Sequence, residues 1–304
     1  MGQAAARTRV TGRFLHFLAV DWSGAAGERH KGIALALADG DGGPPVLVEP
    51  LKRGWSRAEV LMFLQEDLPA DTLVGMDLGI ALPFADCGAY FPGYADSPAD
   101  ARSLWALVDR LCADDPHFAA SSFVDDDALA PYFRRHGGRE GAQFRCDDAE
   151  HGRGRFRVTE HAQAAMGCKP YSNFNLVGAA QVGKSSLTGM RILHHLGGKL
   201  PIWPVDPLPD KGSVIVEIYT TLAAREAGRS ASASKIRSYE ALNEALEILG
   251  SPPVHGEGPI DDHSSDALLS AAWLRKVAHE PQRWNPPDTT EQIARTEGWT
   301  FGAY

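Results

Sequence analysis

A short apolar run that ends in an aspartate lies near the start of the chain. Residues 17–24 read FLAVDWSG, so that three apolar residues lead directly into Asp21. A run of this kind predicts a strand buried on both faces of a sheet. An ionised carboxylate at the end of such a strand is costly unless a cation, a metal ion or several donors lie beside it. Asp21 is therefore either the cap of a turn or a working residue, and we favour the second interpretation.

Composition narrows the class of protein. Of the 304 residues, 44% are hydrophobic and 23% are charged, as in a globular protein with a sizeable core. The net charge of −9 argues against a surface coated in positive charge for binding duplex, but it leaves room for one basic patch. The four cysteines show no C-x-x-C spacing, and we expect them to be reduced in a cytoplasmic protein. No apolar run reaches the length of a membrane span.

Further apolar runs give an α/β pattern. After the strand at residues 17–24, strands are predicted at residues 33–40, 44–54, 72–83 and 213–224. The strands at residues 17–24, 33–40 and 44–54 lie close enough along the chain to form an antiparallel meander. A helix at residues 58–68 follows them, because Ser56 and Glu59 have the spacing of a capping box before a helical apolar pattern.

We expect a single domain over residues 1–304. Its core would comprise about residues 14–83 and 213–280, and a large, mostly helical insertion would occupy about residues 84–212. The predicted core is a mixed five-stranded sheet of order 3-2-1-4-5, flanked by helices. In that order, the strands that carry Asp21 and Asp77 are neighbours, and Glu217 on the fifth strand lies beside Asp77.

Polar residues open the last strongly predicted helix, which reads DDHSSDALLSAAWLRKVA from residue 261. Asp262 lies four residues before Asp266 and His263 lies three before it, so all of them can project from one face. The helix dipole favours carboxylates in a first turn, which is enough to explain Asp261 as a cap. It explains Asp266 poorly, because Asp266 lies beyond the first turn and directly before a run of apolar residues.

Together these acids predict a two-metal site. Mg²⁺ and Mn²⁺ prefer oxygen ligands. In phosphodiester cleavage, one ion of such a pair activates water and the other stabilises the leaving oxygen. The predicted ligands are Asp21, Asp77, Glu217, Asp262 and Asp266. Asp21 would bridge the ions, and His263 would orient the water or move a proton.

The chain resembles the ribonuclease H-like superfamily, and it is most similar to the branch of Holliday-junction resolvases, whose last helix bears an H-x-x-D or D-x-x-D pair. Here the pair is His263 and Asp266. More closely, the chain is similar to domain-of-unknown-function family 429 (DUF429), through the segments VDWSG, GMDLGIALP, VGKSSLTG, IWPVDP, VEIYT, DDHSSDALLSAAWL and EGWTFG. The resemblance implies a metal-dependent nuclease whose substrate is a nucleic acid or a nucleotide. It carries over Asp21, Asp77, Glu217, Asp262, His263 and Asp266; the second acid of the fold is often a glutamate, and here it is Asp77.

One motif indicates different chemistry. Residues 178–185, GAAQVGKS, fit the P-loop pattern before a predicted helix, so that Lys184 and Ser185 would contact phosphate. The preceding segment, YSNFNLV, is polar where a P-loop needs a buried strand. A nucleotide-binding phosphotransferase or ATPase is therefore the alternative, and a non-catalytic binding module of the same fold is the third hypothesis.

Basic residues outside the motif give two weaker indications of phosphate binding. Lys235 follows the fifth strand and could steer a phosphate backbone, although a solvated helix face explains it better. The segment from Arg134 to Arg157 is rich in Arg, His and Gly, which suits either a phosphate-contacting arm or a solvated loop.

Overall fold

A mixed six-stranded sheet forms the centre of the protein. The computed structural model describes residues 12–145, 153–178, 181–230 and 235–304. The strands of the sheet are β1 (His16–Asp21), β2 (Ala34–Asp39), β3 (Val46–Val48), β4 (Thr72–Asp77), β7 (Ile202–Trp203) and β8 (Val214–Glu217). Their order is β3-β2-β1-β4-β8-β7. The first three strands are antiparallel, whereas β1, β4, β8 and β7 run parallel.

The predicted α/β class is confirmed, but the predicted sheet is incomplete. The five expected strands are present as β3-β2-β1-β4-β8, and a sixth strand, β7, extends the edge beyond β8. β7 comes from the segment that we predicted to be a mostly helical insertion. Two residues, Ile202 and Trp203, are too few to show any hydrophobic period, so the sequence pattern gives no sign of this strand.

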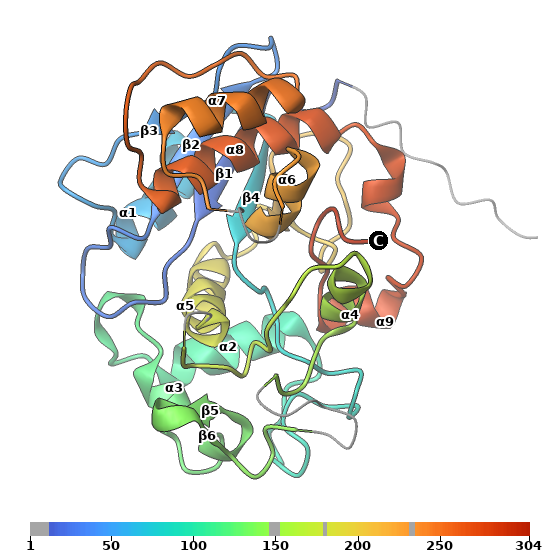
Figure 1. Ribbon diagram of the computed structural model, residues 1–304. Helices are drawn as coiled ribbons and strands as arrows, with labels where there is room; N and C mark the ends of the chain where they lie inside the picture. Colours follow the sequence, from blue (N-terminus) through green and yellow to red (C-terminus); the bar gives the residue numbers. More distant parts are fainter. Residues whose placement is uncertain (1–11, 146–152, 179–180, 231–234) are drawn as a thin grey trace, which may run out of the picture.

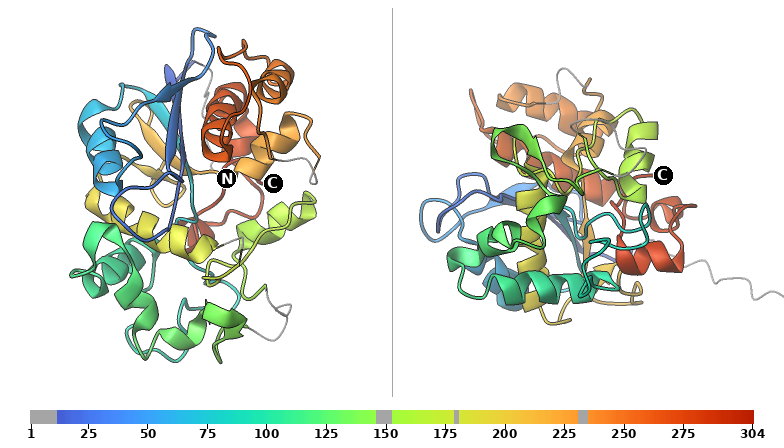
Figure 2. Two further views of the ribbon diagram at one scale, coloured as in Figure 1. Left: turned by 60° about the vertical axis from the view of Figure 1, so that its left-hand side comes forward. Right: turned by 90° about the horizontal axis from the view of Figure 1, so that it is seen from below.

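Helices cover both faces of the sheet, as Figures 1 and 2 show. They are α1 (Arg57–Met62), α2 (Ala101–Leu111), α3 (Ser121–Asp125), α4 (Val158–Ala165), α5 (Val182–His195), α6 (Thr220–Glu226), α7 (Tyr239–Ile248), α8 (Asp262–Val277) and α9 (Glu291–Thr296). Helices α6, α7 and α8 lie on one face, while α1, α2 and α5 lie on the other. Side chains of β1 alternate between the two cores, with Phe17 and Ala19 on the α8 side and Leu18 and Val20 on the α5 side.

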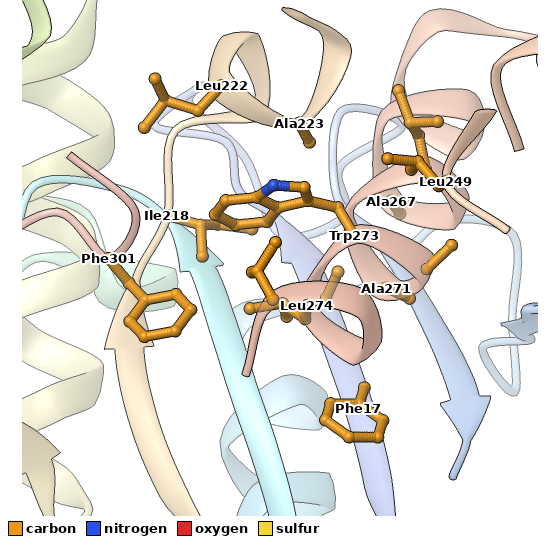
Figure 3. Packing of buried hydrophobic residues seen from close by; sticks show 14 of the residues in the cluster. Phe17, Ile218, Leu222, Ala223, Leu249, Ala267, Ala271, Trp273, Leu274 and Phe301 are labelled. Carbon is orange, nitrogen blue, oxygen red and sulfur yellow. The ribbon is translucent and has the colours of Figure 1, made fainter. Parts of the chain in front are cut away.

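The longest helix, α8, is the main cover of one face. Trp273 and Leu274 are fully buried in this helix, and they pack between the sheet and the C-terminal segment around Phe301 (Figure 3). The N-terminal end of α8 is polar by contrast, and Asp261 caps it by accepting hydrogen bonds from Ser264. The apolar half of α8 therefore fixes where its polar first turns lie.

The segment between β4 and β8 differs in detail from the prediction. It holds α2 to α5 together with a two-stranded ribbon of β5 (Arg134–Arg135) and β6 (Arg139–Glu140). The capping box at α1 is confirmed, since Ser56 and Glu59 exchange hydrogen bonds. Asp100 caps α2 by accepting a hydrogen bond from the Ser103 amide.

The expectations about membrane spans and about the cysteines have different outcomes. In the described part of the chain, no helix combines the length and the apolar character needed to cross a bilayer. The expectation of reduced cysteines is wrong for Cys87, which is disulfide-bonded. Cys112 and Cys168 are free and buried, and Cys146 lies outside the described residues. Cysteines paired by the fold rather than by a short spacing leave no mark in the sequence.

Candidate active site

Two carboxylates meet at the ends of neighbouring strands. Asp21 is the last residue of β1 and Asp77 the last of β4, and the parallel register places the two opposite one another. Asp21 is 7% exposed. Each of the two carboxyl groups shifts the pKa of the other. Burial, followed by the charges of Asp21 and Asp266, raises the pKa of Asp77 well above its ordinary value.

The first turn of α8 brings a histidine onto this pair. His263 Nδ1 lies 2.6 Å from Asp21 Oδ2, while 46% of the His263 side chain remains exposed. The hydrogen bond to the Asp21 carboxylate raises the pKa of His263, and burial opposes that shift. A half-exposed imidazole bonded to a buried carboxylate can exchange its proton with solvent and deliver it at the strand ends.

Asp266 is the third acid of this group. It lies one turn beyond His263 on α8, and it interacts electrostatically with both Asp21 and Asp77. Burial, and then the charge of Asp21, raise the pKa of Asp266 to about 7. Lys235 and His263 lower the pKa of Asp266 in part. We name Asp21, Asp77 and Asp266 the acid cluster.

Asp262 is turned toward basic residues rather than into the acid cluster. Lys235 Nζ lies 3.0 Å from Asp262 Oδ2, and Arg237 Nε donates to Asp262 Oδ1 at 3.2 Å. Although burial opposes them, these hydrogen bonds lower the pKa of Asp262. Both oxygens of the predicted ligand Asp262 are thus paired with cations, and Lys235, predicted to contact phosphate, is engaged with Asp262.

The carboxylate oxygens of Glu217 have even fewer free hydrogen-bonding positions than those of Asp262. Arg157 donates to both Glu217 oxygens at 2.6 and 2.8 Å, Thr300 Oγ1 donates to Oε1 at 2.5 Å, and the Ile80 amide donates to Oε2 at 2.8 Å. Glu217 is 3% exposed. Its carboxylate therefore joins β8 to the C-terminal segment, and we leave it out of the acid cluster.

The last two arginines of the basic segment fit neither of our interpretations of it. Arg157 and Arg155 are 1% and 2% exposed, so neither belongs to a solvated loop or to a phosphate-contacting arm. Arg157 pairs with Glu160 as well as with Glu217, and Arg155 pairs with Asp86. Composition alone cannot separate a buried arginine from an exposed one, because the carboxylates that pair with it come from distant segments.

A cavity of about 490 Å³ opens beside the acid cluster. Asp77 and His263 form part of its wall, the loop after β1 supplies Trp22, and the start of α5 supplies Lys184 and Ser185. Trp22 Nε1 donates to Thr188 Oγ1 of α5 at 3.1 Å, so the loop that follows Asp21 is tied to that helix. Among the described residues, Lys184 has no acidic partner.

The P-loop-like motif has a different role in its described part, which leaves out residues 179–180. The amide of Gly183 donates to Asn175 O and that of Lys184 to Gln181 O, each at 3.0 Å. A Cβ atom on Gly183 would lie 2.5 Å from Asn173 O, so this glycine allows close backbone packing. Asn175 forms only an isolated bridge, not a strand. These amides already donate hydrogen bonds within the protein, which does not favour a loop that binds phosphate.

A second glycine permits the contact between the loop after Asp21 and α5. A Cβ atom added at Gly24 would lie 2.3 Å from the carbonyl carbon of Lys184 and 2.4 Å from the Ser185 amide nitrogen. Gly24→Ala is therefore expected to push the loop after Asp21 off α5 and to lower the free energy of unfolding by about 1–3 kcal/mol. Urea denaturation measures this loss. Gly43→Ala is the control, because its φ is not positive and the one atom near its added Cβ is Asp41 Oδ1, at an ordinary contact distance of 3.6 Å. Equal losses in both variants would contradict the packing contact.

Arg57 is a site residue that sequence reasoning missed. It is 1% exposed and donates to the backbone oxygens of Ser23, Ala25 and His117, at distances from 2.6 to 3.2 Å. Burial, followed by the charge of Arg191, lowers the pKa of Arg57 to about 10. Arg57 thus fixes the loop beside the cavity. An arginine at the start of an amphipathic helix reads as a surface residue, so no sequence signal marks this role.

The described residues hold no group of three or more His, Cys, Asp or Glu side chains arranged to bind a metal ion. Asp21, Asp77 and Asp266 carry carboxylate oxygens, the donor type that hard divalent ions prefer. Comparison of the chain with protein-family models, with curated proteins and with solved structures found no match. The site must therefore be interpreted from its own geometry.

Proposed function

We propose that this protein is a divalent-metal-dependent phosphodiesterase of the nuclease type, built on a ribonuclease H-like fold. The carrying observation is the acid cluster: burial raises the pKa of three carboxylates from β1, β4 and α8, the charge of Asp21 further raises the pKa of the other two, and Asp77 lines a cavity. A structural role would not require such a group, since burying like charges together costs stability. Strained electrostatics of this kind are typical of functional sites.

Carboxylate oxygens suit Mg²⁺ or Mn²⁺ as ligands, and Asp21, Asp77 and Asp266 would hold the ion. A bound ion of this class activates water and stabilises the leaving oxygen in phosphodiester hydrolysis. His263, held by Asp21 and open to solvent, would supply a proton to the departing oxygen. Lys184, at the start of α5, would attract the phosphate into the cavity.

The ribonuclease H-like assignment is part of the same proposal. It is supported by the strand order β3-β2-β1-β4-β8, by acids at the ends of the adjacent strands β1 and β4, and by a final long helix that carries His263 and Asp266. The additional edge strand β7 extends this pattern without altering the neighbours of β1 and β4.

The alternative of a nucleotide-dependent phosphotransferase has less support. Its motif lies at α5, where the described amides are bonded within the protein and no strand precedes the glycine loop. Lys184→Ala separates the two hypotheses. A P-loop enzyme would lose all ATP binding, whereas the proposed phosphodiesterase would only bind its substrate more weakly.

The direct test is cleavage of a labelled panel by the wild-type protein. The panel comprises single-stranded and duplex DNA, RNA, an RNA–DNA hybrid and a four-way junction, each incubated with Mn²⁺, Mg²⁺ or EDTA. The proposal predicts cleavage of at least one substrate with either ion and none with EDTA. Undiminished cleavage in EDTA, or no cleavage of any substrate, would contradict it.

Asp266→Asn is expected to stabilise the metal-free protein. The raised pKa means that folded Asp266 binds its proton more tightly than the unfolded chain does. The free energy of unfolding therefore falls as pH rises from about 4 to about 7, and the loss is complete above that range. Removing the charge should restore about 2 kcal/mol at pH 8 and almost nothing at pH 4.

Urea denaturation in EDTA at both pH values measures this difference. Asp261→Asn is the matched control, because hydrogen bonds from Ser264 outweigh burial and lower the pKa of Asp261. That variant is expected to destabilise the protein at pH 8. A stabilisation by Asp266→Asn of the same size at both pH values would show that the carboxylate charge is not the cause.

A further inference from the structure

A second cavity lies at the N-terminus of α8, where Asp261, His263 and Ser264 line it. Its volume is about 370 Å³, and it lies over β2, β3 and the loop before α1. His263 lines both this cavity and the cavity of about 490 Å³ that holds Lys184. A group that filled both cavities would therefore pass directly over the histidine that is bonded to Asp21.

The walls of the second cavity combine apolar and charged groups. Apolar contacts come from Ile33, Leu35, Leu47, Val48, Pro50 and Trp55. Lys31 and Arg53 lie at the exposed rim, and neither has an acidic partner among the described residues. Glu49 and Asp261 also line the cavity, but Asp261 is already bonded to Ser264.

This mixture suits a nucleotide better than a polyphosphate or a purely apolar ligand. Lys31 and Arg53 match one or two backbone phosphates, which account for much of the affinity in nucleic-acid binding. The apolar wall with Trp55 offers a surface for a base. The carboxylate of Glu49 can accept a hydrogen bond from the exocyclic amine of a base.

Size and shape favour a single strand over a duplex. Each cavity falls in the range of roughly 300–1,000 Å³ that is typical of small-ligand sites, so each suits a unit of about one nucleotide. A duplex would instead need a broad basic face, and the chain carries a net charge of −9. The unpaired cations Lys184, Lys31 and Arg53 are divided between the two cavities.

We propose that the cavity lined by Lys31, Arg53 and Trp55 is a second nucleotide subsite, so that the substrate is a single-stranded oligonucleotide held on both sides of His263. This inference rests on the proposed phosphodiesterase function and names its substrate class. One nucleotide occupies the cavity with Lys184, the next occupies the cavity with Lys31 and Arg53, and the phosphate between them lies at His263.

The test compares a long substrate with a short one. The long substrates are fluorescein-labelled single-stranded hexanucleotides, one of DNA and one of RNA, which distinguish the two sources of the same chemistry. The short substrate is bis(p-nitrophenyl) phosphate. The variant is Lys31→Ala/Arg53→Ala, and the control is Lys199→Ala/Lys211→Ala, which removes the same charge from residues that line neither cavity.

In the Lys31→Ala/Arg53→Ala variant, kcat/KM is expected to fall for both substrates. The loss for the better hexanucleotide should exceed the loss for the diester by at least ~10-fold. The control should change neither substrate by more than about 2-fold. Equal losses for hexanucleotide and diester, or no loss beyond the control, would overturn the second subsite while wild-type cleavage still supported the phosphodiesterase.

Binding gives an independent readout that needs no catalysis. In an Asp21→Asn background, fluorescence anisotropy with the same hexanucleotides should show at least ~10-fold weaker binding after Lys31→Ala/Arg53→Ala. Such weakening supports the subsite even if wild type cleaves nothing, a result that would overturn only the phosphodiesterase. Equal binding by the background and the additional variant, or no binding by either, would overturn the subsite.

Discussion

Replacing Asp21 by Asn is expected to lower the rate of metal-dependent cleavage by at least ~10³-fold. Asp21 is the common partner of the site, because it contacts His263 and Asp77 and shifts the pKa of Asp266. Asparagine removes the negative charge and leaves His263 without the carboxylate that holds its proton. The shape of the side chain is nearly unchanged, so β1 should remain buried and paired as before.

The loss is measured as kcat on the best substrate of the panel, with thermal melting as the check on folding. Asp39→Asn supplies the control, because Asp39 also ends a strand of the sheet but lies at the exposed end of β2 beside His16. That variant should keep its activity within about 2-fold. Activity of Asp21→Asn within 10-fold of wild type would remove Asp21 from the reaction.

Arg157→Met is expected to destabilise the protein more strongly than Gly24→Ala. Arg157 is fully buried between Glu160 and Glu217 and also donates to Glu297 O. Its removal leaves two buried carboxylates without a cation, and breaking a buried pair in this way costs about 3–5 kcal/mol. Methionine fills much of the space, so the loss would report charge rather than a cavity.

Urea denaturation at pH 7 measures this loss. Arg135→Met is the matched control, because the Arg135 and Asp125 side chains are 37% and 63% exposed in their ion pair. An exposed pair of that kind is worth at most about 1 kcal/mol. A loss below 1 kcal/mol for Arg157→Met would mean that Glu160 and Glu217 take up protons at little cost, and that the arginine is not what holds the C-terminal segment.

The part of the fold that sequence reasoning predicted is the part with clear periodicity. The apolar runs before Asp21 and Asp77 are buried strands, the Ser56–Glu59 capping box is present, and Asp261 caps α8 as expected. These features depend on neighbours within a few residues, so the local sequence contains the information.

The remaining features depend on contacts between distant segments. β7 consists of two residues that pair with β8, and the buried Arg157 meets Glu217 across 60 positions of the chain. Arg57 similarly holds Ser23 across 34 positions. A charged residue in the sequence shows its type but not its partner, so composition could not show that these arginines are buried.

The candidate site likewise has a part that the local sequence predicts and a part that depends on distant contacts. The two strand-end acids and the polar turn of α8 could be selected because a carboxylate next to an apolar run is unusual. Glu217 and Asp262 are also carboxylates at the end of a strand or helix, yet both are paired with cations in the fold. Only the distances to Arg157 and Lys235 separate them from Asp21, Asp77 and Asp266.

The central claim is that the acid cluster binds a divalent cation, and titration of Mn²⁺ by calorimetry tests it most directly. The titration should be done at pH 8, where Asp266, with a pKa of about 7, is mostly ionised. Wild type is expected to show saturable binding that Asp21→Asn and Asp77→Asn each lose, while Asp39→Asn retains it. Absence of binding to wild type at millimolar Mn²⁺, or equal binding by wild type and both variants, would contradict the claim.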